Sequence, residues 1–316
     1  MNQHCTRPRK SGPIRRWMRF SIRTLLVITA ICAVSVWIVT IWMKAQGQRR
    51  VLQSLPIAPD SWGHRDVEIT YDFQRSGRGQ PRFAPQWMVN LLGVDCFANV
   101  VGLRTTVSPI HPEAKGTALL AKLSKLPELE EMSLFMSEAT DNDLAFLARH
   151  KRLRVLELPF SPVTGVGLKG FASKNQLHVL SLRASSASDD GLAAISSFEN
   201  LEELDLGTDA YCAIPRLYSR AGLAHLVSLS KLKKLNLWGA DLNDAELAEV
   251  AKLSSLEQLV FWPRKATGKG ILQLKTLSNL RYLDADLDSE TNIPPGELEM
   301  TLVSLAAKKD AVPSEK

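Results

Sequence analysis

The chain has few of the residues on which cross-linked and catalytic proteins depend. Only four cysteines and six histidines occur among its 316 residues, so disulfide bonds do not explain the fold. The histidines form no HExxH pair, and the GxSxG, P-loop and GxGxxG patterns are absent. We therefore expect no metal site, no cofactor and no catalytic residue. An envelope hydrolase with an unrecognised site is the enzymatic alternative.

The sequence also lacks a basic excess outside its first 43 residues. Its net charge is +6, yet residues 1–43 hold seven arginines or lysines and no acidic residue. The rest of the chain therefore carries 32 basic and 33 acidic side chains. Since a near-neutral surface matches a phosphate backbone poorly, we predict no nucleic-acid partner.

Leucine, by contrast, recurs at a fixed step of 24 residues, interrupted once by a step of 31. Each of these leucines opens an LxxLxL pattern, in which the second and third places are apolar in all seven copies. A second apolar pair, three residues apart, follows most copies and indicates a helical turn after a strand. The leading leucines are Leu129, Leu153, Leu177, Leu201, Leu232, Leu256 and Leu280.

This period predicts an α/β fold, a leucine-rich repeat solenoid in the form of a right-handed βα horseshoe with about eight repeats. The solenoid is expected to span residues 98–290, with a degraded first repeat at Val101 and Leu103. The longer step adds seven residues, which predicts an inserted loop at 208–218 that Tyr218 anchors.

Two kinds of polar position in the repeat have structural interpretations. His150 occupies the place that Phe198 and Leu253 hold in other repeats, so we interpret it as a buried structural residue. A hydroxyl or amide side chain stands four residues before each helical leucine, where it can accept a hydrogen bond as an N-cap. These predicted caps are Thr140, Thr164, Ser188, Ser219, Asn243 and Thr267.

A stretch of 20 uncharged residues, Thr24–Met43, follows the basic tail. As a helix it would be roughly 30 Å long, which matches the hydrocarbon core of a bilayer. Because most basic residues precede it, the positive-inside bias places the N-terminus in the cytoplasm and the solenoid on the extracytoplasmic side. We predict a retained single-pass transmembrane helix. A cleaved signal peptide and a buried helix of a cytosolic protein are the alternatives.

Five parts follow from these patterns. Before the solenoid we expect a helix that continues through residue 54, a strand at 67–73 and a short helix from Pro85. Cys96 and Cys212 could form a bridge, but two unpaired thiols are the favoured interpretation. The parts are a basic cytoplasmic tail (1–23), the transmembrane helix (24–43), a juxtamembrane and N-terminal cap segment (44–97), the solenoid (98–290), and a C-terminal cap helix with a tail (291–316).

The turns TDNDL, TGVGL, SDDGL and NDAEL resemble the T-D-x-G-L leucine-rich repeats of bacteria and the cysteine-containing type of F-box adaptors. The head RFSIRTLL and the stretch LLGVDCFANVVGL are similar to membrane-anchored bacterial leucine-rich repeat proteins. The resemblance implies the architecture and no particular activity. The F-box likeness implies a cytosolic adaptor of a ubiquitin ligase as the alternative. In place of the expected asparagine or cysteine ladder stand Ser137, Ser161 and Ser185, for which we expect a shorter hydrogen-bonded ladder.

Residues two, four and six places after each leading leucine are expected to point outward from the concave side of the sheet. Aromatic side chains gather there beside acidic ones, a pattern typical of anchors for a partner. We therefore predict a protein partner, with an envelope polymer as the alternative ligand. An alternative interpretation is that the tryptophan rings fold over the strand ends and seal the core. The predicted binding residues are Trp238, Trp262, Tyr282, Glu157, Arg183, Glu203 and Asp205.

Overall fold

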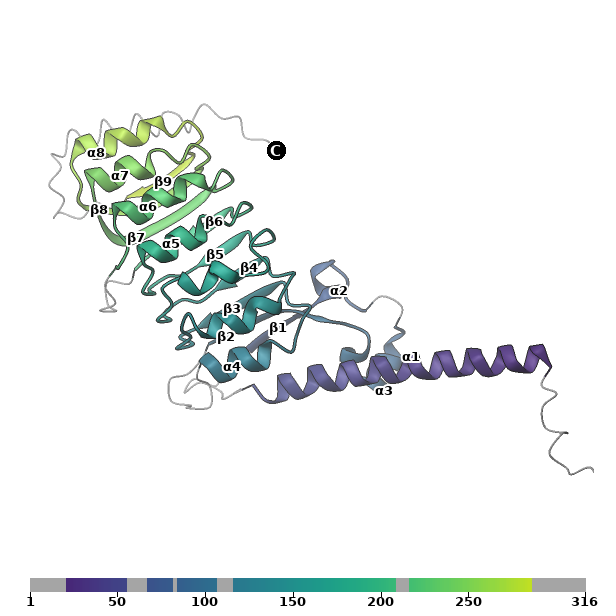
Figure 1. Cartoon of the computed structure of the whole chain (residues 1–316). Helices are drawn as coiled ribbons and strands as arrows, with labels where there is room; N and C mark the ends of the chain where they lie inside the picture. Colours follow the sequence, from purple (N-terminus) through teal and green to yellow (C-terminus); the bar gives the residue numbers. More distant parts are fainter. Residues whose placement is uncertain (1–20, 56–66, 82–83, 107–115, 209–215, 286–316) are drawn as a thin grey trace, which may run out of the picture.

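The computed structural model describes residues 21–55, 67–81, 84–106, 116–208 and 216–285. These residues form a long row of strands with helices along one side, and one long helix lies at the N-terminal end (Figure 1). The predicted C-terminal cap helix (291–316), most of the basic tail and most of the inserted loop lie outside the described residues. Cys212 lies outside them too, so its relation to Cys96 stays a prediction.

All nine strands in the described part of the chain belong to one sheet, in which they follow their sequence order. β1 is antiparallel to β2, and β2 to β9 are parallel. Leucines one repeat apart face each other, as Leu156 faces Leu180 and Leu180 faces Leu204, so the predicted leucine-rich repeat fold is confirmed. The strands are β1 (Val67–Tyr71), β2 (Val100–Thr106), β3 (Glu131–Phe135), β4 (Val155–Glu157), β5 (Val179–Ser181), β6 (Glu203–Asp205), β7 (Lys234–Asn243), β8 (Gln258–Lys265) and β9 (Tyr282–Ala285).

Each repeat returns through a helical turn on one side of the sheet (Figure 1). Two of these turns are 3-10 helices, η4 and η5, and others end in a 3-10 turn. The solenoid helices are α4 (Gly116–Leu123), η4 (Asp143–Arg149), η5 (Val166–Gly170), α5 (Asp189–Ile195), α6 (Arg220–His225), η6 (Leu226–Ser228), α7 (Asp244–Val250), α8 (Gly268–Gln273) and η7 (Leu274–Thr276). The helices before the solenoid are α1 (Ile22–Gln53), α2 (Asp72–Arg75), α3 (Gln86–Leu92) and η2 (Val94–Cys96).

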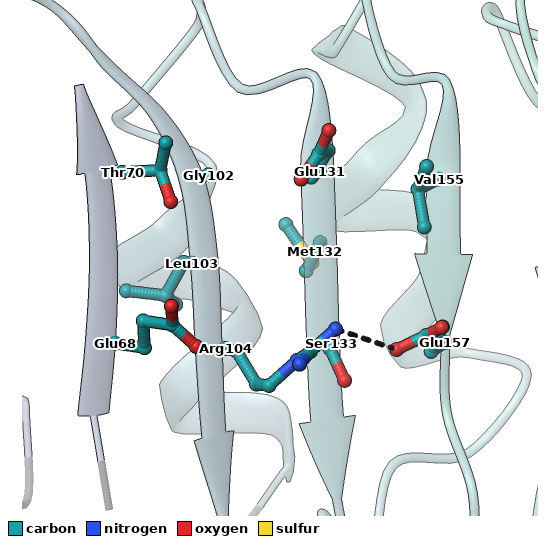
Figure 2. Close-up of a pocket in the computed structure, with 10 residues that line it drawn as sticks. All are labelled: Glu68, Thr70, Gly102, Leu103, Arg104, Glu131, Met132, Ser133, Val155 and Glu157. Carbon is teal, nitrogen blue, oxygen red and sulfur yellow. Dashed lines mark ion pairs between the residues drawn. The ribbon is translucent and has the colours of Figure 1, made fainter. Parts of the chain in front are cut away.

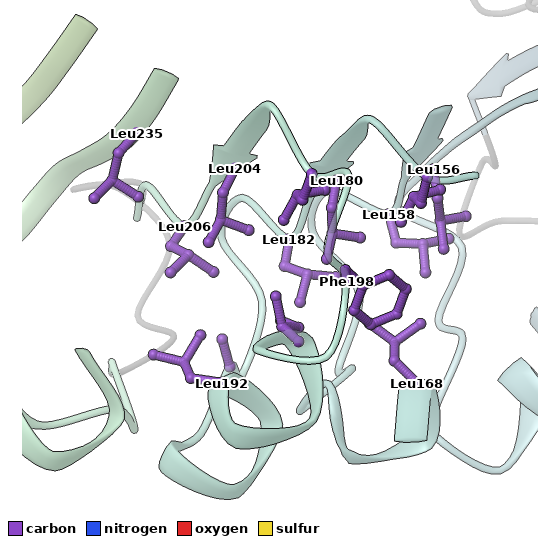
Figure 3. Packing of buried hydrophobic residues seen from close by; sticks show 14 of the residues in the cluster. Leu156, Leu158, Leu168, Leu180, Leu182, Leu192, Phe198, Leu204, Leu206 and Leu235 are labelled. Carbon is purple, nitrogen blue, oxygen red and sulfur yellow. The ribbon is translucent and has the colours of Figure 1, made fainter. Parts of the chain in front are cut away.

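The core lies between the sheet and the helical turns, and all seven leading leucines are buried in it. Figure 3 shows strand leucines such as Leu180 and Leu204 on one side of this layer, with Leu168 and Leu192 from the helical turns on the other. Burial alternates along β3, whose second and fourth residues are buried while the others are half-exposed. Each repeat therefore buries its leucines only by stacking on its neighbours.

Some polar side chains are buried within this apolar layer. Ser137 and Ser161 share a hydrogen bond of 2.8 Å between their hydroxyls, which confirms part of the expected serine ladder. Ser185 does not continue this ladder, because its hydroxyl donates to the backbone carbonyl of Leu182, three residues earlier, over 2.6 Å. His150 is fully buried, as predicted for a structural residue.

The predicted N-caps are confirmed at three positions, where the side chains of Ser188, Ser219 and Asn243 each accept a hydrogen bond from a first-turn amide. Thr267 is the N-cap residue of α8, but its side chain makes no cap bond and its hydroxyl donates to Asp244. The prediction for Thr140 is wrong, since Asn142 precedes η4 and the Thr140 hydroxyl donates to Asp143. Thr164 Oγ1 accepts from Val166 N over 3.4 Å while it donates to Asp141.

Hydrogen bonds between aspartates and cap residues of successive repeats were missed by the N-cap interpretation. The aspartate after the cap residue of one repeat accepts from the backbone N–H and the hydroxyl of the cap residue in the next repeat. Asp189 does so with Ser219 over 2.6 and 2.7 Å, and Asp244 does so with Thr267 over 2.6 Å for both bonds. The carboxylates therefore join neighbouring repeats along the start of their helices.

The inserted repeat is held as the sequence predicted. The Tyr218 ring is buried, its hydroxyl donates to Leu206 O over 3.4 Å, and the Arg216 guanidinium lies 5.1 Å from the ring centroid. Arg216 also pairs with the buried Glu246 over 2.7 Å. Burial raises the pKa of the Tyr218 hydroxyl, so it stays protonated at neutral pH.

The long helix α1 joins the apolar stretch to the end of the solenoid without a break. None of its most apolar window is buried, which contradicts the alternative of a core helix within this chain. Its C-terminal part is docked: Ala45, Gln48 and Val51 are buried, and Gln48 bonds to both Ala98 O and Val100 N. These two hydrogen bonds satisfy backbone groups beside the start of β2, where the sheet would otherwise lack a cover.

The segment between α1 and the solenoid differs from its prediction at one point. The expected strand 67–73 ends at Tyr71, so Phe73 lies in the short helix α2 rather than in the strand. The change occurs because Asp72 bonds to Asn99, its amide donating to Asn99 O over 3.1 Å and its carboxylate accepting from Asn99. The predicted helix from Pro85 is present as α3, with Pro85 as its N-cap residue.

Candidate binding surface

Two tryptophans in the middle of β7 and β8 gather with two arginines, one from β8 and one from just after β5. The rings of Trp238 and Trp262 are stacked, with centroids 5.6 Å apart and planes 13° apart. The Arg183 guanidinium lies over Trp238 at 5.9 Å from its centroid, and that of Arg264 lies over Trp262 at 4.6 Å. We call these four residues the tryptophan–arginine stack. Both side chains are half-buried, and the Trp262 Nε1 atom is itself buried without a hydrogen-bond partner.

The repeat itself places the two rings side by side. Leu237 faces Phe261 in the β7–β8 ladder, so the next residue of each strand, a tryptophan, projects from the open face of the sheet. The register then shifts between Leu237 and Asp241, so Trp262 pairs with Asp241, and Gly239 within this shift has a φ of +73°. A Cβ on Gly239 would lie 2.8 Å from Thr208 O, so only glycine lets the chain pass that close to the preceding repeat.

Side chains two residues earlier on the same strands hold the backbone next to the stack. Asn236 Oδ1 accepts from the Trp238 amide over 2.9 Å, and Asp205 Oδ1 accepts from the Gly207 amide over 2.9 Å. Arg183 follows β5 and reaches Trp238 of β7, two strands away, across the repeat that contains Gly207. The short side chains of Asn236 and Asp205 thus fix the backbone next to the stack.

Next to the stack lies a hollow of about 250 Å³ on the open face of the sheet. Burial raises the pKa of Asp205, while its hydrogen bond from Gly207 and the nearby Arg183 oppose that rise. Glu203 is paired with Lys234 over 2.6 Å. The lining residues are Glu157, Val179, Leu180, Ser181, Glu203, Leu204, Asp205, Lys234, Leu235, Asn236, Gln258 and Val260.

The structure brings together some predicted binding residues and separates others. Arg183, Trp238, Trp262 and Asp205 lie at one end of the surface. Tyr282 faces Gln258 instead, four residues before Trp262 on β8, so it is not part of the stack. Arg264 was missed because its place in the repeat normally turns inward. β8, however, runs on to Lys265, and period-two alternation then puts residues 262 and 264 on one face.

A second hollow, of about 100 Å³, lies over β1 to β4 at the other end of the sheet (Figure 2). Glu68, Glu131 and Glu157 line it together with Arg104, and Arg104 approaches Glu157 to 3.9 Å. Among the described residues no group of three histidine, cysteine or acidic side chains could hold a metal ion.

Together, the ordered sheet, the leucine register and the returning helical turns define the chain as a leucine-rich repeat solenoid. No model of a known family matches the sequence, and no curated protein matches it. Among solved structures, an internalin (inlF) from Listeria monocytogenes is similar, with 17% identity, a TM-score of 0.44, 74% of this chain covered and 57% of that one. Internalin C2 from the same organism shows 20% identity and a TM-score of 0.41, with 61% and 78% covered. The chain thus spans little more than half of the first internalin structure.

Proposed function

We propose that this chain is a single-pass membrane protein of the bacterial leucine-rich repeat type. Its solenoid of about eight repeats binds a protein partner through the tryptophan–arginine stack, without catalysis. The observation that carries the proposal is the stack itself, a pair of indole rings and two guanidinium groups on an open sheet face. Tryptophan and arginine are the side chains most enriched among the strongest contributors to protein interfaces.

The contacts within the stack favour a protein over an envelope polymer. A sugar ring packs on an open aromatic face. Here each indole has the other indole over one side and a guanidinium over its ring as well. What remains for a ligand is the ring edges and the arginine N–H groups, which suit carbonyl and carboxylate oxygens of a polypeptide. The paired charges beside it, Glu203 and Lys234, add polar contacts of both signs.

The anchoring part of the proposal depends on α1. Its apolar window has a mean hydropathy of 2.5 and no buried share, so in water that surface would have no cover. A bilayer supplies the cover, and the seven basic residues before Met43 favour a cytoplasmic N-terminus with the solenoid extracytoplasmic. Since α1 continues into the docked residues Ala45 to Val51, the solenoid is joined to its anchor by helix rather than by a loose linker.

Crosslinking and pulldown from intact cells test the proposal with the full-length chain. The variant Trp238→Ala/Trp262→Ala should lose the protein that the wild type captures. The matched control is Phe135→Ala/Phe160→Ala, which removes another half-buried ring pair, 4.7 Å between centroids, from the far end of the sheet. Capture by this control should persist. Equal capture by both variants and the wild type would refute the stack as the binding site. If purified envelope polysaccharide binds the wild type in the absence of any protein and fails to bind the tryptophan variant, the partner is a polymer and not a protein.

A further inference from the structure

The short helix α3 exposes an apolar face that nothing in the described part of the chain covers. Trp87 is 65% exposed and Leu91 is 74% exposed, and they are four residues apart on one side of the helix. α3 contains no charged residue and no buried residue. Its polar edge consists of Gln86 and Asn90, which are joined by a hydrogen bond of 2.9 Å. Such a helix contributes little to the solenoid core, and an exposed tryptophan of this kind is typical of a membrane–water interface.

The position of α3 along α1 says what covers that face. Arg49 of α1 donates to the carbonyl of Leu92, the last residue of α3, and pairs with Asp95 of η2 over 2.9 Å. A Cβ on Gly93 would overlap the Arg49 side chain, so the turn after α3 is pressed against α1. Asp95 also accepts a hydrogen bond of 3.0 Å from the Tyr71 hydroxyl, which ties this turn to β1.

The height of this contact matches the bilayer surface. Arg49 is six residues after Met43, the end of the apolar stretch, which corresponds to about 9 Å along a helix. The headgroup layer on each side of a bilayer is roughly 5 to 8 Å thick, so Arg49 lies at its outer edge. Figure 1 shows α3 beside the middle of α1, next to the part that leads into the apolar stretch. An uncharged helix with an exposed tryptophan at that level would meet lipid rather than bulk water.

We propose that α3 is a second membrane contact, in which Trp87 and Leu91 enter the lipid interface beside the transmembrane helix. The inference rests on the proposed anchoring of α1 and adds a property that anchoring alone does not give. A single helix leaves the solenoid free to tilt and to rotate about the membrane normal. Two contacts, joined through Arg49 and Asp95, restrict the tilt and hold the open face of the sheet at a set orientation to the lipid.

Nitroxide labelling of the full chain tests this inference. The four native cysteines are replaced by alanine, and single cysteines are introduced as Leu91→Cys, Ile38→Cys and Val227→Cys. All three sites are exposed, so labelling leaves the core intact. The proteins are reconstituted in phosphatidylcholine–phosphatidylglycerol vesicles. Relaxation by oxygen, which concentrates in lipid, is compared with relaxation by a water-soluble nickel chelate.

We expect oxygen to dominate at Ile38→Cys, nickel to dominate at Val227→Cys, and the oxygen-to-nickel ratio at Leu91→Cys to shift clearly toward that of Ile38→Cys. A ratio at Leu91→Cys equal to that at Val227→Cys, with Ile38→Cys still in lipid, would overturn the interfacial role of α3 and leave the anchor standing. A water-like ratio at Ile38→Cys would overturn the anchor and this inference with it. Dipolar broadening between Leu91→Cys labels of different molecules would show that a second copy covers α3, which also overturns it.

Discussion

Replacing His150 tests how the core of the solenoid tolerates a titratable group. The imidazole is fully buried, its Nε2 lies 3.2 Å from Leu123 O, and its Nδ1 has no hydrogen-bond partner. Burial lowers the pKa of His150, and hydrogen bonds to backbone groups of Leu123, Leu147 and Leu126 oppose that shift only in part. The folded protein therefore holds this side chain neutral at a pH where the unfolded chain protonates it.

The sign of the pH dependence follows from that difference. With the folded-state pKa below the ordinary value of 6.5, the unfolded state binds more protons as the pH falls below 6.5. The contribution of His150 to stability is thus complete above pH 6.5 and is lost progressively below it. The limiting slope is about 1.4 kcal/mol per pH unit, so the loss between pH 7.5 and 5.5 is at most about 1.4 kcal/mol.

Urea unfolding of the full chain in detergent, followed by circular dichroism at pH 7.5 and 5.5, measures this loss. His150→Leu places in this repeat the residue found at Leu253 and Leu277. The drop in unfolding free energy on acidification should be smaller than in the wild type, by at most about 1.4 kcal/mol. The control His225→Gln removes an exposed histidine and should keep the wild-type drop. An equal acid sensitivity of His150→Leu and the wild type would show that His150 is not held neutral in the folded state.

Two further predictions concern the contacts between repeats. Gly191→Ala would push a methyl group into the backbone carbonyl of Thr164, so we expect a loss of roughly 1–3 kcal/mol in unfolding free energy. The control Gly170→Ala has open space around it and should change the unfolding free energy little. Equal urea midpoints for the two variants would contradict the close approach. Asp189→Ala removes the acceptor of two hydrogen bonds from Ser219 and should lower the unfolding free energy by on the order of 1–2 kcal/mol. The control Asp190→Ala removes an exposed neighbour and should leave the unfolding free energy nearly unchanged. A lower melting temperature for Asp190→Ala than for Asp189→Ala would reject the role of these carboxylates in joining repeats.

The period of the leucines was sufficient to predict the sheet and its register. A step of 24 residues can place Leu156, Leu180 and Leu204 opposite each other only if the chain follows the same path in every repeat. The repeat length therefore determines the register of many strand pairs at once. The sequence also showed the glycine of the T-D-x-G-L turn, but it did not show why a glycine is needed there. Gly167 and Gly191 are required because a Cβ at either would overlap the backbone of the preceding repeat, a contact between residues far apart in sequence.

The same limit applies where the chain departs from its repeat. Phe73 continues an alternating pattern and looks like a strand residue, but Asp72 binds Asn99, and that contact ends β1 two residues earlier. Local alternation reports only which side of a segment is apolar. It carries no information about a hydrogen-bonding partner that arrives from 27 residues away.

The predicted binding residues Trp238, Trp262 and Arg183 depended on such non-local contacts to differing degrees. That Trp238 and Trp262 lie on neighbouring strands followed from their equal place in successive repeats. The register shift that pairs Trp262 with Asp241 did not follow from the repeat. The contact of Arg183 with Trp238 did not follow, because a whole repeat and the inserted loop separate them in the chain. It depends on the reach of the Arg183 side chain across the intervening repeat, which brings its guanidinium to 5.9 Å from the Trp238 centroid. Equal places in successive repeats locate the two tryptophans, but they do not say which charged side chain from another strand lies over them.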